Sequence, residues 1–212
     1  MDSSKLKLEA YDLLGLILPG LIAVCEAWIF LRGWQAFLLA AAQITGTTLT
    51  LLLLASFATG NAVQELGDLV VNLTKGKRYL RRARDRFWAS SEADFAKKAI
   101  KAELGHPVTS VDAAFDHCLT KVEGRFAKRD IFLATSDLCR SLVVLAFLAI
   151  VPASRVLANA QPRPWLAFAA FVILALTFSL LMWRRMVRFR ELSDITVFRI
   201  YLAAEAKSET KT

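Results

Sequence analysis

The sequence predicts an all-α integral membrane protein with four transmembrane helices in two hairpins. A helical cytoplasmic insert is expected between the second and third spans, and a C-terminal cytoplasmic helix after the fourth. Of the 212 residues, 56% are hydrophobic, and the mean hydropathy of +0.43 is too high for an ordinary globular surface. Apolar runs reach the ~20 residues that a helix needs to cross roughly 30 Å of hydrocarbon. Period-two alternation typical of strands is absent over any useful length.

The first span is predicted at Leu13 to Leu31, within "YDLLGLILPGLIAVCEAWIFL", which contains a Pro-Gly pair and the carboxylate of Glu26. A cleaved signal peptide is the competing interpretation, because Lys5 and Lys7 precede the run. Acidic residues in the would-be basic region, the length of the run and the lack of a small-residue cleavage site argue against it. These acidic residues are Asp2, Glu9 and Asp12. We therefore expect a retained span.

The remaining spans are predicted at Ala36 to Ala58, Leu138 to Ala158, and Pro164 to Trp183. Only short links separate the first from the second and the third from the fourth, which predicts antiparallel neighbours in each pair. The expected organisation is thus a hairpin over residues 1–58, the insert over 59–137, a second hairpin over 138–183 and a C-terminal helix and tail over 184–212.

Orientation follows from the positive charges beside the spans, because loops rich in Lys and Arg stay in the cytoplasm. The second span is followed by a dense basic stretch, and the fourth by Arg184, Arg185, Arg188 and Arg190. The short links carry few cations. Both termini and the insert are therefore expected in the cytoplasm.

The insert is predicted to be helical. One helix is expected to start at Ser91, with Asp94 in a capping-box position, and to stop at Gly105. Thr109 and Asp112 repeat this spacing and open what reads as one long helix towards the third span. After the fourth span, "RRMVRFRELSDITVFRIYLAA" reads as a further helix.

Residue types suited to catalysis or metal binding do not form a recognisable pattern. Cys25, Cys118 and Cys139 form no CxxC pair and are interpreted as reduced packing residues. His106 and His117 have no companions at the spacing of a triad or a metal site, and no common catalytic or nucleotide-binding fingerprint is present. We predict no enzymatic activity, no cofactor and no metal.

The strongest local signal is the basic stretch "KGKRYLRRARDRFW". It is either a positive anchor beside anionic lipid, at about 1 kcal/mol per cation, or a surface that receives phosphates. Arginine forks bind phosphate oxygens in pairs, and the neighbouring Tyr79, Phe87 and Trp88 could stack on bases. The candidate ligand-binding residues are Lys75, Lys77, Arg78, Arg81, Arg82, Arg84 and Arg86.

Polar residues inside the spans are the candidate pore residues. Glu26 either faces a water-filled path or extends to the outer interface. On the second span, Gln43, Gly46, Thr47 and Thr50 share one helix face, which suits close helix contact or a wet passage. The candidate pore residues are Glu26, Gln43, Thr47 and Thr50. Arg140 is expected to extend towards the interface or to pair with Glu65 or Asp68.

Three segments carry a family resemblance: "YDLLGLILPG", "GNAVQELG" and "VFRIYLA". With the two-span, insert, two-span layout, they resemble small four-span effectors of bacterial anti-phage defence, including the channel effector of the Hailong system. The resemblance implies a homo-oligomer, such as a tetramer, in the bacterial inner membrane. It also implies a nucleotide or single-stranded oligonucleotide signal made by a partner nucleotidyltransferase. Opening would then depolarise the infected cell.

Two functions of different classes remain open from the sequence. The first is a ligand-gated, membrane-permeabilising effector that senses its ligand on the basic cytoplasmic surface. The second is a non-conducting membrane scaffold whose insert docks a partner protein. A lipid enzyme is disfavoured, because no cluster of acidic or histidine residues lies at an inner span end.

Overall fold

The computed structural model describes residues 13–73, 84–108, 110–122, 127–160 and 164–209, and every element in these ranges is a helix. Among the described residues, four helical stretches are long and apolar enough to cross a membrane: Gly15–Arg32, Gly46–Leu73, Lys128–Asn159 and Trp165–Ala206. These findings confirm the all-helical class and indicate a multi-pass membrane protein. The hairpin arrangement and the cytoplasmic location of the insert stay predictions.

The chain divides into two compact units. We call Met1–Val71 with Ala134–Met186 the apolar unit, and Asn72–Leu133 with Val187–Thr212 the polar unit. The polar unit contains α6 (Ser91–Leu104) and α7 (Val111–Lys121), which are short, carry many charges and are not candidate spans. Helices of this composition belong outside the hydrocarbon of a bilayer.

The apolar unit begins with a π-helical turn, η1 (Leu13–Ile17), that leads directly into α2 (Leu18–Arg32). Pro19 lies at the start of α2 and has no N–H to continue the regular hydrogen-bond ladder into η1. At the other end, Gly33 adopts φ 87°, which ends the helix and reverses the chain into α3 (Trp34–Ala42).

The predicted second span, one helix from Ala36 to Ala58, is wrong. The chain instead forms α3, breaks after Ala42, and starts α4 (Gly46–Leu73). Thr45 explains the break, because its Oγ1 accepts a hydrogen bond from the backbone N–H of Thr48 at 3.4 Å and also bonds the Thr48 hydroxyl at 2.8 Å. A hydroxyl that satisfies the first free N–H groups of a helix favours a helix start over a continuous helix.

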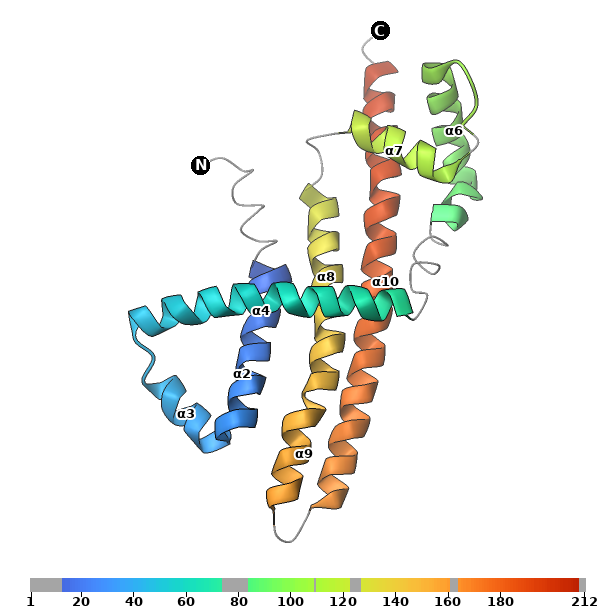
Figure 1. Ribbon diagram of the computed structural model, residues 1–212. Helices are drawn as coiled ribbons and strands as arrows, with labels where there is room; N and C mark the ends of the chain where they lie inside the picture. Colours follow the sequence, from blue (N-terminus) through green and yellow to red (C-terminus); the bar gives the residue numbers. More distant parts are fainter. Residues whose placement is uncertain (1–12, 74–83, 109, 123–126, 161–163, 210–212) are drawn as a thin grey trace. The chain divides into compact units, whose positions relative to one another are not determined.

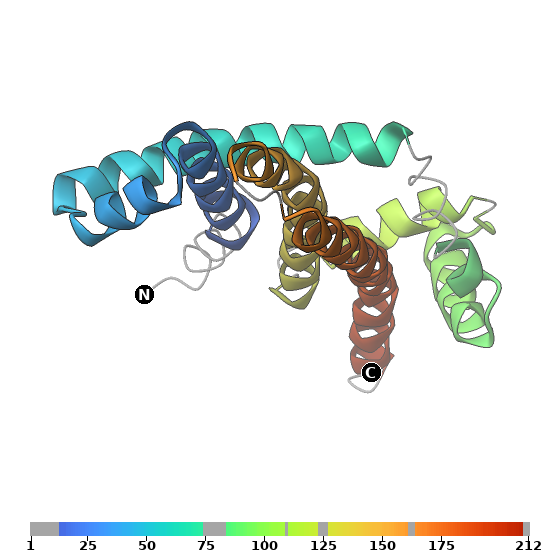
Figure 2. The same ribbon diagram turned by 90° about the horizontal axis from the view of Figure 1, so that it is seen from below.

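Within the apolar unit, α4 runs across α2 and α8 (Ala127–Leu148), as both views show (Figure 1, Figure 2). The small buried core where they meet contains Ala23 of α2, Val63 of α4, and Val144 and Leu145 of α8. A turn at Ala149 separates α8 from α9 (Ile150–Asn159). Pro152 accounts for this interruption, since it cannot donate to the carbonyl of residue 148.

The last helix, α10 (Trp165–Glu209), is continuous over 45 residues and contributes residues to both units. The predicted separate C-terminal helix is therefore wrong, because no glycine or proline follows Trp183 within α10 to interrupt the hydrogen-bond ladder. At 1.5 Å per residue the helix is about 68 Å long, more than twice the hydrocarbon thickness. Part of α10 must therefore extend beyond a bilayer that its apolar half crosses.

The ends of the helices in the polar unit confirm one predicted start and one predicted stop. α6 begins at Ser91, as predicted, although its N-cap residue is Ser90, and the N-cap of α7 is Ser110. The predicted cap residue Thr109 lies outside the described residues. Gly105 ends α6 in the left-handed conformation at φ 75°, as predicted. The predicted long helix into the third span is wrong, because α7 ends at Lys121 and α8 begins at Ala127.

The polar unit has a core of its own, built around Phe198 of α10. Phe198 is fully buried and packs against Phe87 at 4.8 Å and Phe115 at 5.7 Å between ring centroids. Cys118 is also fully buried here, and burial raises the pKa of its thiol to about 12. The predicted packing role of Cys118 is thus confirmed, as is that of the buried, unpaired Cys139 in the apolar unit.

Candidate functional site

Two of the three resemblance segments meet inside the apolar unit. Pro19 cannot donate a hydrogen bond to the carbonyl of Gly15, which would be its partner in a regular helix. The side chain of Gln64 on α4 donates to that carbonyl instead, at 2.7 Å. Gln64 therefore supplies the hydrogen-bond donor that Pro19 lacks, and this bond links the two segments where α2 and α4 cross.

Glycines allow the backbones of α2 and α4 to touch at this crossing. A Cβ at Gly20 would lie 2.7 Å from the backbone nitrogen of Gly60, and a Cβ at Gly60 would lie 2.8 Å from the carbonyl carbon of Leu16. Distances below 3.0 Å leave no room for a methyl group against backbone. Close crossing at small residues is the usual way in which membrane helices associate.

Arg140 of α8 forms an ionic cluster with α4. Its guanidinium pairs with Asp68, as predicted, and with Asp137 at 3.3 Å. The aliphatic part of the Arg140 side chain packs over Gly67, where a Cβ would lie 2.8 Å from Cγ of Arg140. Glu65, the other predicted partner, is exposed. The cluster thus fixes the registration of α4 against α8 near the end of α4.

Glu26 lies on α2, and its side chain is half-buried. Its Oε2 atom is buried and has no hydrogen-bond partner among the residues that the structure describes. A carboxylate oxygen in this position needs a proton, water or a group from another molecule, since an unpaired buried charge is costly.

The other candidate pore residues are exposed, and they are not on one helix. Gln43 is the C-cap of α3, whereas Thr47 and Thr50 lie in the first turns of α4. The shared face that the sequence predicts is therefore wrong for Gln43, because the break before Gly46 removes it from the α4 register. Thr50 donates to the carbonyl of Gly46 at 3.0 Å, an ordinary bond for threonine in a helix. A pore role for these residues stays a prediction.

The candidate ligand-binding residues are only partly described: Lys75, Lys77, Arg78, Arg81 and Arg82 lie outside the described residues. Arg84 is described and is half-buried in the polar unit. Its Nε donates to Asp194 at 2.8 Å, its NH1 lies 3.3 Å from Asp112, and its guanidinium stacks over Phe115 at 3.9 Å. Burial opposes the charge of Arg84, but the hydrogen bonds and charges of both aspartates outweigh it and raise its pKa.

Arg86 has a second internal role, because it pairs with Glu191 of α10 although most of its side chain is exposed. The aromatic neighbours are also used within the unit. Phe87 is buried and stacked on Phe198, so the expectation that it stacks on a base is wrong. Trp88 is half-buried, at 6.0 Å from the ring of Phe198. Tyr79 lies outside the described residues.

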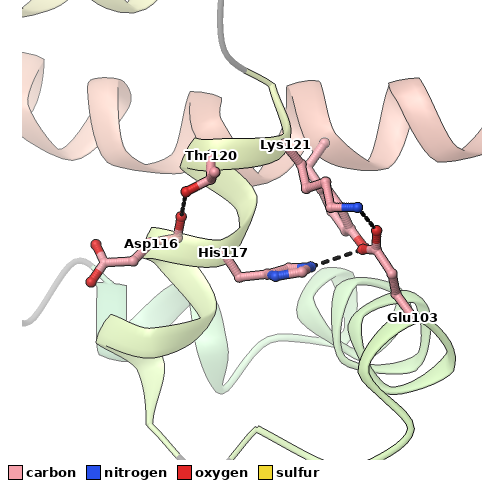
Figure 3. Close-up of polar contacts among 6 residues, drawn as sticks. Glu103, Asp116, His117, Thr120 and Lys121 are labelled. Carbon is pink, nitrogen blue, oxygen red and sulfur yellow. Dashed lines mark hydrogen bonds and ion pairs between the residues drawn. The ribbon is translucent and has the colours of Figure 1, made fainter.

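A polar cluster that the sequence does not predict centres on Glu103. His117 Nε2 lies 2.8 Å from one carboxylate oxygen, Lys121 pairs with the other, and the hydroxyl of buried Tyr201 donates at 3.2 Å. Figure 3 shows His117 and Lys121 of α7 directed at Glu103 of α6. Hydrogen bonds from Lys121, His117 and Tyr201 lower the pKa of Glu103 against a smaller effect of burial. The cluster joins α6, α7 and α10.

This cluster predicts an acid-sensitive contribution to the stability of the polar unit. The folded-state pKa of Glu103 lies below the ordinary 4.5, so its contribution is present above that value and is lost as pH falls through the folded-state pKa. Glu103→Gln should therefore reduce the loss of thermal stability on acidification, by about 1 kcal/mol or less for a partly exposed site. Unfolding temperatures measured between about pH 6 and pH 3 test this. Asp116→Asn, whose exposed side chain is directed away from Glu103, is the control (Figure 3).

A second basic surface lies on the polar unit, on α6. A pocket of ≈ 180 Å³ is lined by Trp88, Lys97, Lys98, Lys101, Pro107 and Val108, together with buried Ile100. The sequence does not predict this pocket, since the α6 lysines lie between acidic residues, Asp94 and Glu103, as on an ordinary solvated helix face. The pocket forms because Trp88 and the loop after Gly105 lie beside these lysines in the folded unit.

The fold indicates a multi-pass α-helical membrane protein that also contains a charged helical unit. Among the described residues, no group of three or more His, Cys, Asp or Glu side chains could hold a metal ion. Comparisons with known protein families, with curated proteins and with solved structures find no match to this chain.

Proposed function

We propose that the protein is a ligand-gated, membrane-permeabilising effector whose polar unit binds a nucleotide or a short oligonucleotide. The observation that carries this proposal is the continuity of α10. Its apolar first part belongs to a candidate membrane span, and its last part supplies Val197, Phe198 and Tyr201 to the core of the polar unit. A ligand that repacks this core would act directly on a membrane helix, because a continuous helix transmits displacement along its axis.

The exposed apolar surface of the membrane helices supports assembly into a homo-oligomer such as a tetramer. Only 6% of the most apolar stretch of α10 and 17% of that of α4 is buried within one chain. Lipid or further copies must cover this surface. In such an assembly, the half-buried side chain of Glu26 would lie beside a shared, hydrated path.

The cellular setting follows from the charge distribution and from the family resemblance. Because cationic residues beside membrane spans stay on the inner side, we propose that both termini and the polar unit lie in the cytoplasm of a bacterium, at its inner membrane. There a partner nucleotidyltransferase could supply the ligand. Permeabilisation in answer to infection makes this an antiviral defence function.

Ion release from liposomes tests the proposal. Purified protein is reconstituted and efflux of a trapped ion is recorded with and without nucleotides and short single-stranded oligonucleotides. We expect a ligand-dependent change of at least about tenfold in the efflux rate, equivalent to about 1.4 kcal/mol. The Glu26→Gln variant should alter cation selectivity without altering ligand binding. Liposomes that remain tight with every oligonucleotide, although the protein is correctly inserted, would contradict the proposal.

A non-conducting scaffold is the second candidate, and one observation favours it. Phe95 of α6 is 69% exposed and lines a groove with Ala99, Ala102 and Leu202. An exposed aromatic ring beside an apolar groove is suited to docking a partner protein. Tight liposomes together with loss of partner binding in Phe95→Ser would favour this function over the first.

A further inference from the structure

We infer that the pocket formed by Trp88, Lys97, Lys98 and Lys101 is a phosphate-binding subsite of the polar unit, and that its ligand is a nucleoside phosphate. The class of ligand in this inference rests on the proposed function, whereas the location of the site rests on the geometry of α6. The site differs from the predicted basic stretch, since of the predicted residues only Arg84 and Arg86 are described and both have internal ionic partners.

The lysines of this pocket provide uncompensated positive charge. Lys97 pairs with Asp94 at 2.9 Å, whereas neither Lys98 nor Lys101 has an ionic partner within the described part of the chain. Their separation by three residues places both ammonium groups on neighbouring turns of one helix face. Two such groups attract a doubly charged phosphate, and lysine binds phosphate as a flexible point charge.

The other wall of the pocket is apolar and aromatic. Trp88 is half-buried, and Lys97 Nζ lies 5.4 Å from its ring centroid, so the indole already attracts a cation. Pro107 and Val108 complete this wall from the loop after α6. A planar base beside the indole would gain stacking energy, which inorganic phosphate cannot do.

The size of the pocket limits what it can enclose. A volume of ≈ 180 Å³ is below the ~300 Å³ at which pockets for drug-sized ligands begin. The pocket therefore holds one phosphate with part of one base, and the rest of a longer ligand lies on the surface. Lys98 also lines the neighbouring groove, but Glu205 lines that groove too and would repel further phosphates there.

Binding measurements on the full-length protein in detergent micelles test the inference. The probes are ATP, inorganic phosphate and, for protein in nanodiscs, vesicles containing phosphatidylglycerol. We expect ATP to bind more tightly than inorganic phosphate, and Lys98→Glu and Lys101→Glu each to weaken ATP binding by roughly tenfold or more. The matched control is Lys128→Glu, an exposed lysine of the polar unit outside the pocket, which should change binding by less than about twofold.

The outcomes separate the subsite from the proposed function. Equal effects of Lys98→Glu, Lys101→Glu and Lys128→Glu, or no binding of any probe, would overturn the subsite. Vesicle binding that depends on Lys98 and Lys101, without ATP binding, would support a phosphate site but overturn the nucleotide as its ligand. ATP binding that needs both lysines but leaves liposome efflux unchanged would support the subsite and contradict ligand gating.

Discussion

Replacing Gly60 with alanine should lower the free energy of unfolding of the apolar unit by about 3 kcal/mol. The added Cβ would meet the carbonyl of Leu16, which is backbone and cannot rotate away as a flexible side chain would. The crossing would have to open, and the bond from Gln64 to the Gly15 carbonyl, made at this crossing, would be lost with it. Unfolding in mixed micelles, followed by circular dichroism against increasing SDS, measures the effect.

Gly46→Ala is the matched control, because Gly46 lies on the same helix and nothing lies within 4 Å of its Cβ position. Alanine there should be neutral or stabilise α4 by up to about 1 kcal/mol, as expected for glycine replaced in a helix. Equal and small effects of both variants would show that α2 and α4 do not touch at Gly60.

Replacing Arg84 with alanine should destabilise the polar unit by about 3–5 kcal/mol. Asp194 is only 5% exposed at its side chain and would lose its guanidinium partner, while Phe115 would lose the stacked cation. Amide hydrogen exchange in α6 and α7 reports on this unit separately from the membrane helices, and should accelerate in the variant. Arg84→Met with Asp194→Asn removes both charges together and should recover most of the loss.

Arg188→Ala provides the comparison for this prediction. Arg188 is 68% exposed at its side chain and lies 3.7 Å from Glu191, so its removal should cost less than about 1 kcal/mol. If Arg84→Ala and Arg188→Ala accelerate exchange equally, Arg84 is not a structural residue. Arg84 would then again be a candidate ligand-binding residue, as the sequence predicts.

Local features of the fold were predictable from the sequence. Apolar runs predicted that four helical stretches could span a membrane, although the second one begins at Gly46 and not at Ala36, and Gly105 predicted the end of α6. The pair of Arg140 with Asp68 was also predictable, since both residues lie where charged side chains enter apolar helices. These features depend on residues close together in the chain, whose hydropathy and backbone preferences act whatever the rest of the molecule does.

Other local predictions failed because a single side chain changed the balance between alternatives of similar energy. Hydropathy alone predicts a continuous helix past Thr45, but the hydrogen bonds of this residue favour a new helix that begins at Gly46. The predicted C-terminal helix is continuous with the fourth span, because no glycine or proline interrupts α10 after Trp183. Apolar periodicity does not distinguish one continuous helix from two consecutive helices. The hydrogen bonds of a single hydroxyl can favour one of these two structures over the other.

Sequence by itself determined that this chain is helical, apolar and suited to crossing a membrane several times. Tertiary structure alone decided which charges are available to a ligand. Arg84 is occupied by Asp194, which lies 110 residues away in the chain, whereas Lys98 and Lys101, beside Trp88, have no ionic partner among the described residues. The reason is physical: charge and hydropathy are properties of each residue, but ion pairing and burial depend on segments that only packing brings together.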